Sequence, residues 1–131
     1  MIDKVAWIEL SDGRVLSTRS KGKDTYYLPG GKREPGESDV DTLVREISEE
    51  LSVQIDPKTA AHLGTFEAQA HGQPPGVLIR MTCYTAQYSG TLTPANEIAE
   101  LIWLSAADTT QIAPVDHLVF AHLHAAGLLH P

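Results

Sequence analysis

A double glycine followed by an amphipathic, strongly acidic helix constrains this chain more than any other feature. Gly30 and Gly31 permit backbone conformations that a side chain would forbid, so the loop they form can approach a ligand closely. Apolar residues then recur at three- and four-residue steps, which predicts a helix over residues 39–51 with one face in the core. Ser38 is its predicted N-cap, and Asp41 completes a capping box. A flexible loop therefore leads into a helix with defined ends.

The same helix has a second face composed of acidic residues. Glu46, Glu49 and Glu50 fall at positions i, i+3 and i+4, so their carboxylates share one side. Residues 34–50 hold seven carboxylates and a single basic residue, Arg45, within a chain of net charge −7. Like charges this close destabilise an isolated helix. A solvated acidic surface and a divalent-cation site are the two interpretations.

Strands account for most of the remaining pattern. They are predicted at residues 4–10, 14–18, 61–70, 76–88 and 101–104. The turn at residues 11–13 predicts that the first two form a β-hairpin. A terminal helix is predicted at residues 115–129. Strands interspersed with two main helices predict an α/β sandwich with a mixed sheet, built as one domain over residues 1–131.

Composition and charge exclude several classes of protein. A net charge of −7 without a Lys/Arg stripe argues against a nucleic acid polymer as partner. No apolar run approaches the roughly 18 to 20 residues of a membrane helix, and the N-terminus lacks a signal-peptide pattern, so we expect no membrane partner and a cytoplasmic location. Unpaired sheet edges leave both a monomer and a homodimer open.

Two groups of potential metal or redox residues have simpler interpretations. Cys83 is the only cysteine and lies in a strand-like run, so a packed thiol is expected, with a nucleophilic role as the alternative. Histidines cluster near the C-terminus without enough carboxylate partners, and we expect a surface cluster rather than a zinc site. Its members are His117, His122, His124 and His130.

Residues 31–53 follow a fixed spacing. After Gly31 come five residues and Glu37, then seven residues and Arg45-Glu46-Ile47, one residue, Glu49-Glu50, one residue, Ser52 and Val53. This spacing resembles the signature motif of the Nudix hydrolases, the Nudix box, and the preceding LPGGK run at residues 28–32 is also typical of them. The resemblance implies an α/β/α sandwich with a loop-helix-loop catalytic motif. Ser52 departs from the family's glycine, so a change in helix termination is expected there.

The resemblance also implies the chemistry. Nudix hydrolases cleave diphosphate linkages with Mg²⁺, for which Mn²⁺ can substitute. The implied metal ligands are Glu46, Glu49, Glu50 and the carbonyl of Gly30. By the same resemblance, Arg45 holds the glutamates in place and Glu37 braces the loop. Substrate would contact the glycine loop and its neighbours, namely Gly30, Gly31, Lys32 and Arg19, although Arg19 could equally be an exposed strand-end residue.

The general base is left open, because related enzymes recruit it from different places. The candidates are Glu46, Glu97 and Glu100, and we prefer Glu97 to Glu100, with a solvated loop acid as the alternative for both. Aromatic side chains could stack on a nucleobase or fill the core. These are Tyr26, Tyr27, Phe66 and Tyr84.

Substrate preference is only weakly marked. Ala68 and Gln69 stand where related ADP-ribose and dinucleoside polyphosphate hydrolases tend to have proline and tyrosine, respectively. Their absence favours a MutT-like pyrophosphohydrolase acting on a nucleoside triphosphate or a related, possibly oxidised, nucleotide. A nucleoside diphosphate sugar hydrolase is the enzymatic alternative. A noncatalytic nucleotide-binding module and an acidic protein-interaction domain are the alternatives of other classes.

Overall fold

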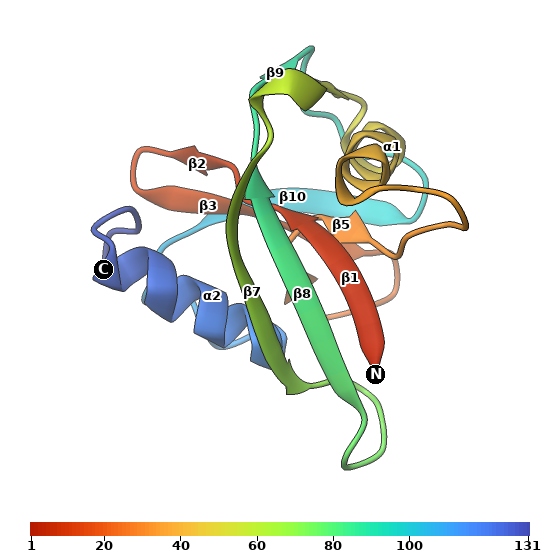
Figure 1. Ribbon diagram of the computed structural model, residues 1–131. Coiled ribbons are helices and arrows are strands. Elements are labelled where there is room, and N and C mark those ends of the chain that lie inside the picture. The colour runs from red at the N-terminus through yellow and green to blue at the C-terminus, as the bar shows by residue number, and fades with distance from the viewer.

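The computed structural model describes residues 1–131, which form ten strands, two α-helices and one short 3₁₀ helix (Figure 1). The helices are α1 (Asp39–Leu51) and α2 (Pro114–Ala125), and the 3₁₀ helix spans Pro57–Thr59. The strands are β1 (Ile2–Trp7), β2 (Leu10–Ser11), β3 (Arg14–Ser20), β4 (Tyr26–Tyr27), β5 (Gly30–Gly31), β6 (Gln54–Ile55), β7 (Ala61–Gln69), β8 (Leu78–Thr85), β9 (Tyr88–Ser89) and β10 (Ile98–Leu104).

The long strands form two sheets. One has the order β5-β1-β8-β7, and the other has the order β10-β3-β2 with β4 also paired to β3. Only the β1–β8 pairing is parallel, with Ile2 opposite Ile79 and Trp7 opposite Tyr84. The remaining pairings are antiparallel, so the predicted mixed sheet is confirmed.

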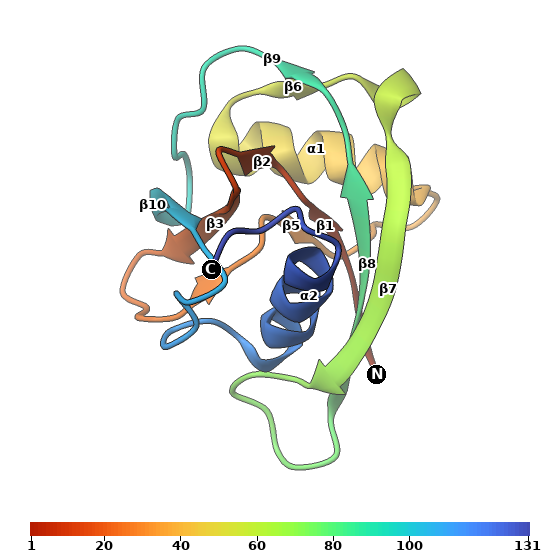
Figure 2. The ribbon, with the colours of Figure 1, turned by 90° about the vertical axis from the view of Figure 1, so that its left-hand side faces the viewer.

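Two apolar cores hold the helices on opposite sides of the strands (Figures 1 and 2). The larger core joins α2 to β7 and β8, and its buried helix residues are Val115, Val119, Phe120 and Leu123. The smaller core joins α1 to β1, with Leu43 and Ile47 fully buried against Trp7. An α/β/α sandwich results, in which the apolar stripe of α1 fixes the rotation of that helix.

The first helix has the predicted bounds and cap. The Asp41 N–H donates to Ser38 Oγ at 3.1 Å, and the Ser38 N–H donates back to the Asp41 carboxylate at 3.1 Å. The helix ends at Ser52, which adopts a left-handed conformation with φ 62°. Glycine usually occupies this position, and serine here keeps the same geometry. The expected change in helix termination is therefore wrong.

The predicted hairpin of residues 4–10 and 14–18 is only partly correct. β2 pairs with β3 across the turn, but β1 belongs to the other sheet, between β5 and β8. Residues 5–8 are all buried, so side chains on both faces of this segment pack against other parts of the protein. A central strand has such neighbours on both faces, whereas one face of a hairpin strand is commonly exposed to solvent.

Three further boundaries differ from prediction. The segment 76–88 divides into β8 and the separate β9, which pairs with β6, and the strand predicted at 101–104 begins earlier, at Ile98. The terminal helix ends at Ala125 rather than 129, because Gly127 takes a left-handed conformation and its N–H bonds the His124 carbonyl. Neither helix is long and apolar enough to cross a membrane.

Candidate active site

The glycine loop is packed too tightly for side chains. A Cβ on Gly30 would lie 2.0 Å from the Val5 carbonyl oxygen, and the φ of Gly30 is +150°. A Cβ on Gly31 would lie 2.4 Å from the carboxyl carbon of Glu46. The two glycines therefore let β5 pair with β1 while the Glu46 side chain of α1 lies close to Gly31.

Glu50 is a buried acid beside this loop. The residue is only 5% exposed, and its Oε1 accepts a long hydrogen bond of 3.4 Å from the Gly30 N–H. Burial, followed by the neighbouring Glu46 carboxylate, raises the pKa of Glu50 far above its ordinary value. Two adjacent carboxylates in a place with little water require a proton or a cation between them.

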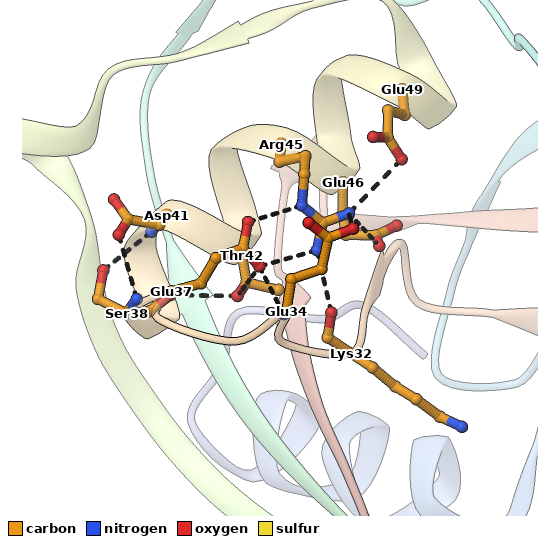
Figure 3. A network of polar contacts seen from close by, with 9 residues as sticks. All are labelled: Lys32, Glu34, Glu37, Ser38, Asp41, Thr42, Arg45, Glu46 and Glu49. Carbon is orange, nitrogen blue, oxygen red and sulfur yellow. Dashed lines mark hydrogen bonds and ion pairs between the residues drawn. The ribbon is translucent and has the colours of Figure 1, made fainter.

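Arg45 joins the loop to the helix through several contacts (Figure 3). Its guanidinium forms a two-point ion pair with Glu37, at 2.7 and 2.9 Å, and donates to Glu46 Oε1 at 2.8 Å and to the Lys32 carbonyl at 3.0 Å. The hydrogen bonds from Arg45 are the main reason that the pKa of Glu37 falls to about 2. Glu49 lies 3.6 Å from the guanidinium, and its side chain is 52% exposed. Arg45 therefore contacts Glu37, Glu46 and the loop at Lys32 together, while its role in holding the glutamates and the role of Glu37 in bracing the loop stay predictions.

A cavity of about 330 Å³ opens over the buried acid. Its wall contains five residues of the predicted site, namely Gly30, Gly31, Lys32, Glu50 and Glu97. The lining also includes apolar residues, among them Ile2, Leu28, Ile79, Met81 and Val115. The cavity therefore combines acidic, basic and apolar lining residues, within the size range of small-molecule sites.

The three candidates for the general base lie in different surroundings. Glu46 accepts the hydrogen bond from Arg45 and does not line the cavity. Glu97 lines the cavity, and its charge contributes to the raised pKa of Glu50. Glu100 instead accepts hydrogen bonds from the Tyr26 hydroxyl at 2.6 Å and from Arg19 Nε at 2.7 Å, and these lower its pKa. Arg19 also donates to the Lys23 carbonyl and does not line the cavity. The structure thus brings Glu97, but not Glu100 or Arg19, to the buried acid.

Among the four aromatic candidates for base stacking, only Tyr27 lines the cavity. Its ring meets His71 edge-on with centroids 6.0 Å apart, and Lys4 Nζ lies 5.9 Å from its centroid. Tyr84 donates to Asp39, and Phe66 packs against the larger core. The packed-thiol interpretation of Cys83 is confirmed, since the residue is fully buried and burial raises its pKa to about 12.

Asp116 is a buried acid that the sequence analysis did not select. It follows the cavity-lining residues Ala113 to Val115, and its Oδ2 accepts a hydrogen bond from the Leu28 N–H at 3.0 Å. Its Oδ1 is buried without a partner. A signal was available, because residue 116 lies on the same helical stripe as the apolar residues 119, 120 and 123.

Asp116 gives stability a specific pH dependence. Burial raises its pKa from 3.8 to about 7, so between these values the folded protein holds a proton that the unfolded chain has lost. The free energy of unfolding therefore falls as pH rises through this window, by roughly a few kcal/mol, and changes no further from this cause above it. The free energy of unfolding can be measured with urea at about pH 4.5 and about pH 8, and the Asp116→Asn variant should lack the part of the difference that Asp116 contributes. An unchanged difference between the two pH values would contradict the assignment.

The donor set around Glu50 suits a hard divalent cation. No group of three or more His, Cys, Asp or Glu side chains is arranged to enclose a metal ion by itself. Glu50 and Glu46 nevertheless provide two adjacent, largely buried carboxylates whose repulsion a cation would relieve. Mg²⁺ is commonly held by one or two carboxylates, with water and substrate phosphate oxygens completing the shell. The residues present therefore fit such an ion.

Comparison with known proteins agrees with this geometry. The family model described as NUDIX domain matches residues 4–123. The CTP pyrophosphohydrolase of Escherichia coli (strain K12) is 32% identical over 123 residues, which cover 88% of this chain and 86% of that protein. Among solved structures, the E. coli ORF135 protein superposes with a TM-score of 0.73 at 31% identity, covering 96% of this chain and 92% of that one. A MutT NUDIX hydrolase from Burkholderia pseudomallei has the same fold, with a TM-score of 0.72 at 24% identity, and the match covers 94% and 95% of the two chains.

Proposed function

The chain belongs to the Nudix family and is a pyrophosphohydrolase, and we propose that it cleaves the diphosphate linkage of a nucleoside triphosphate, or of a related oxidised nucleotide, with Mg²⁺. The mixed lining of the cavity carries this proposal. A nucleotide has a planar, largely apolar base and a polyanionic phosphate chain, and the cavity lining offers apolar residues and Tyr27 as well as the acid Glu50. The phosphate chain would meet carboxylates, so a cation is required between them.

Glu50 and Glu46 are the side chains that we assign to the metal, with the Gly30 carbonyl and Glu49 as the further predicted ligands. Bound Mg²⁺ would offset the charge of the phosphate oxygens and lower the pKa of a coordinated water. Mn²⁺, which takes the same oxygen ligands, is expected to substitute. Arg45 keeps the Glu46 carboxylate in one orientation through the 2.8 Å hydrogen bond.

Hydrolysis requires a water oxygen to attack one phosphorus while the bridging P–O bond breaks. In our proposal Glu97 accepts the proton of that water. It is the candidate base that lines the cavity, and its side chain makes no hydrogen bond that would have to break first. The leaving phosphate takes the electron pair of the broken bond. Lys32, at the cavity wall, provides positive charge for a phosphate oxygen. The general base contributes roughly 10²- to 10⁴-fold to rate in enzymes of this kind.

A panel of substrates tests the proposal. We expect nucleoside triphosphates, including cytidine and oxidised purine nucleotides, to be hydrolysed faster than nucleoside diphosphate sugars, ADP-ribose or dinucleoside polyphosphates. Each of these competitors carries a further sugar or nucleoside beyond the phosphate chain, which a cavity of about 330 Å³ would also have to hold. Released phosphate and pyrophosphate are measured with each compound. Preferential hydrolysis of a nucleotide sugar would replace the substrate class, and binding without turnover across the panel would favour a noncatalytic module.

A further inference from the structure

The loop at residues 91–97, between β9 and β10, is docked on the C-terminal end of α1. The last carbonyls of a helix have no donor within the helix and must find one elsewhere. Here three consecutive carbonyls receive donors from this one loop. The hydrogen bonds run from Asn96 Nδ2 to the Glu49 carbonyl (2.7 Å), from the Ala95 N–H to the Glu50 carbonyl (2.9 Å) and from the Thr93 N–H to the Leu51 carbonyl (2.9 Å).

Left-handed residues occur on both sides of this contact. Ser52 ends α1 with φ 62°, and Asn96 has φ 53°. Such conformations are unfavourable for residues with a Cβ, although asparagine tolerates them better than most. The Ser52 hydroxyl donates to the Thr93 carbonyl at 3.2 Å, so the residue that departs from the Nudix box is also bonded to the loop. Asp12, in the β2–β3 turn, is the third non-glycine residue with positive φ and lies outside the cavity lining.

Glu97 is held from both sides by these contacts. Asn96, the preceding residue, is bonded to the helix, and the Glu97 carbonyl accepts a hydrogen bond from the Lys21 N–H at 2.8 Å. Ile98, the following residue, is buried and begins β10. The backbone that carries the Glu97 side chain is therefore fixed relative to α1, the helix that carries Glu46 and Glu50.

We propose that Asn96 is a positioning residue, which holds Glu97 at the wall of the cavity that Glu50 also lines by bonding the C-terminal end of α1. This inference rests on the proposed function, because it gives Glu97 the role of general base. Asparagine satisfies two requirements at once. It adopts the left-handed backbone at low cost, and its amide donates to the Glu49 carbonyl, which an aspartate side chain would repel.

Asn96→Gly tests this role, because glycine keeps the left-handed backbone and removes only the side-chain hydrogen bond. We expect kcat to fall by about tenfold, as for a misplaced catalytic group, while KM changes by less than about twofold. Glu97→Gln should lower kcat by at least about tenfold. The double variant should be no slower than Glu97→Gln, because moving a side chain that can no longer act as a base does not lower the rate further.

A general structural role would give a different result. If Asn96 only supported the fold, Asn96→Gly would slow Glu97→Gln by the same factor as it slows the wild type, and this outcome overturns the inference. Asp12→Gly is the matched control, because it replaces a left-handed residue away from the cavity and should leave kcat unchanged. If the wild type is active and Asn96→Gly has the same kcat, only the positioning role is overturned. If the wild type itself is inactive, the proposed function is overturned as well.

Discussion

The Glu50→Gln variant is expected to hydrolyse its nucleotide at least about 10²-fold more slowly than the wild type while folding at least as stably. The amide keeps the shape of the side chain but cannot provide the negative charge that we assign to the metal. Stability should not fall, because burial and Glu46 make the ionised carboxyl unfavourable in the folded state. Initial rates and thermal unfolding midpoints measure the two effects.

The control for this variant is Glu34→Gln. Glu34 belongs to the same acidic segment and lies 3.8 Å from Arg45, but its side chain is 65% exposed. This substitution changes the formal net charge by the same amount as Glu50→Gln and should leave turnover within about twofold, as expected of an exposed ion pair. Equal losses in both variants would show that overall acidity, and not a site at Glu50, supports activity.

Gly30→Ala is expected to destabilise the fold by about 3 kcal/mol or more. The added Cβ would lie 2.0 Å from the Val5 carbonyl oxygen, which belongs to the backbone of a central strand and cannot move without disturbing both β1 and β8. The denaturant midpoint of unfolding measures the loss. Activity should fall with it, because β5 positions the loop against Glu50.

Gly36→Ala separates packing from backbone preference. Gly36 also has a positive φ, of 84°, but nothing lies within 4 Å of the Cβ that alanine would add. Its cost should be the conformational one alone, about 1 kcal/mol. Similar losses for the two alanine variants would contradict a steric role for Gly30.

Helix α1 was predictable because several local signals coincide. Ser38, Asp41 and the apolar stripe define its start, length and buried face, and the structure has all three as predicted. The fixed spacing from Gly31 to Glu50 also indicated which side chains would meet near the glycine loop. These are short-range relations, which the period of a helix determines.

Relations between distant segments were not predictable in the same way. The parallel pairing of β1 with β8 depends on which strands lie side by side in the sheet, and the hydrophobic periodicity of the sequence does not determine that. The neighbours of Glu97 and Glu100 differ because one faces the cavity and the other meets Tyr26 and Arg19, although the two acids are three residues apart. The role of Asn96 depends on a contact across 47 residues. Such contacts become visible only when the chain is folded.

The most direct test of the central claim is the rate of nucleotide hydrolysis as a function of Mg²⁺, for the wild type and for Glu50→Gln. If Glu50 and Glu46 hold the metal, wild-type turnover should disappear in EDTA and return with added Mg²⁺. Glu50→Gln should need a higher Mg²⁺ concentration and reach a lower maximum. Full wild-type turnover in EDTA, or identical Mg²⁺ dependence in the two proteins, would contradict a metal site at these carboxylates.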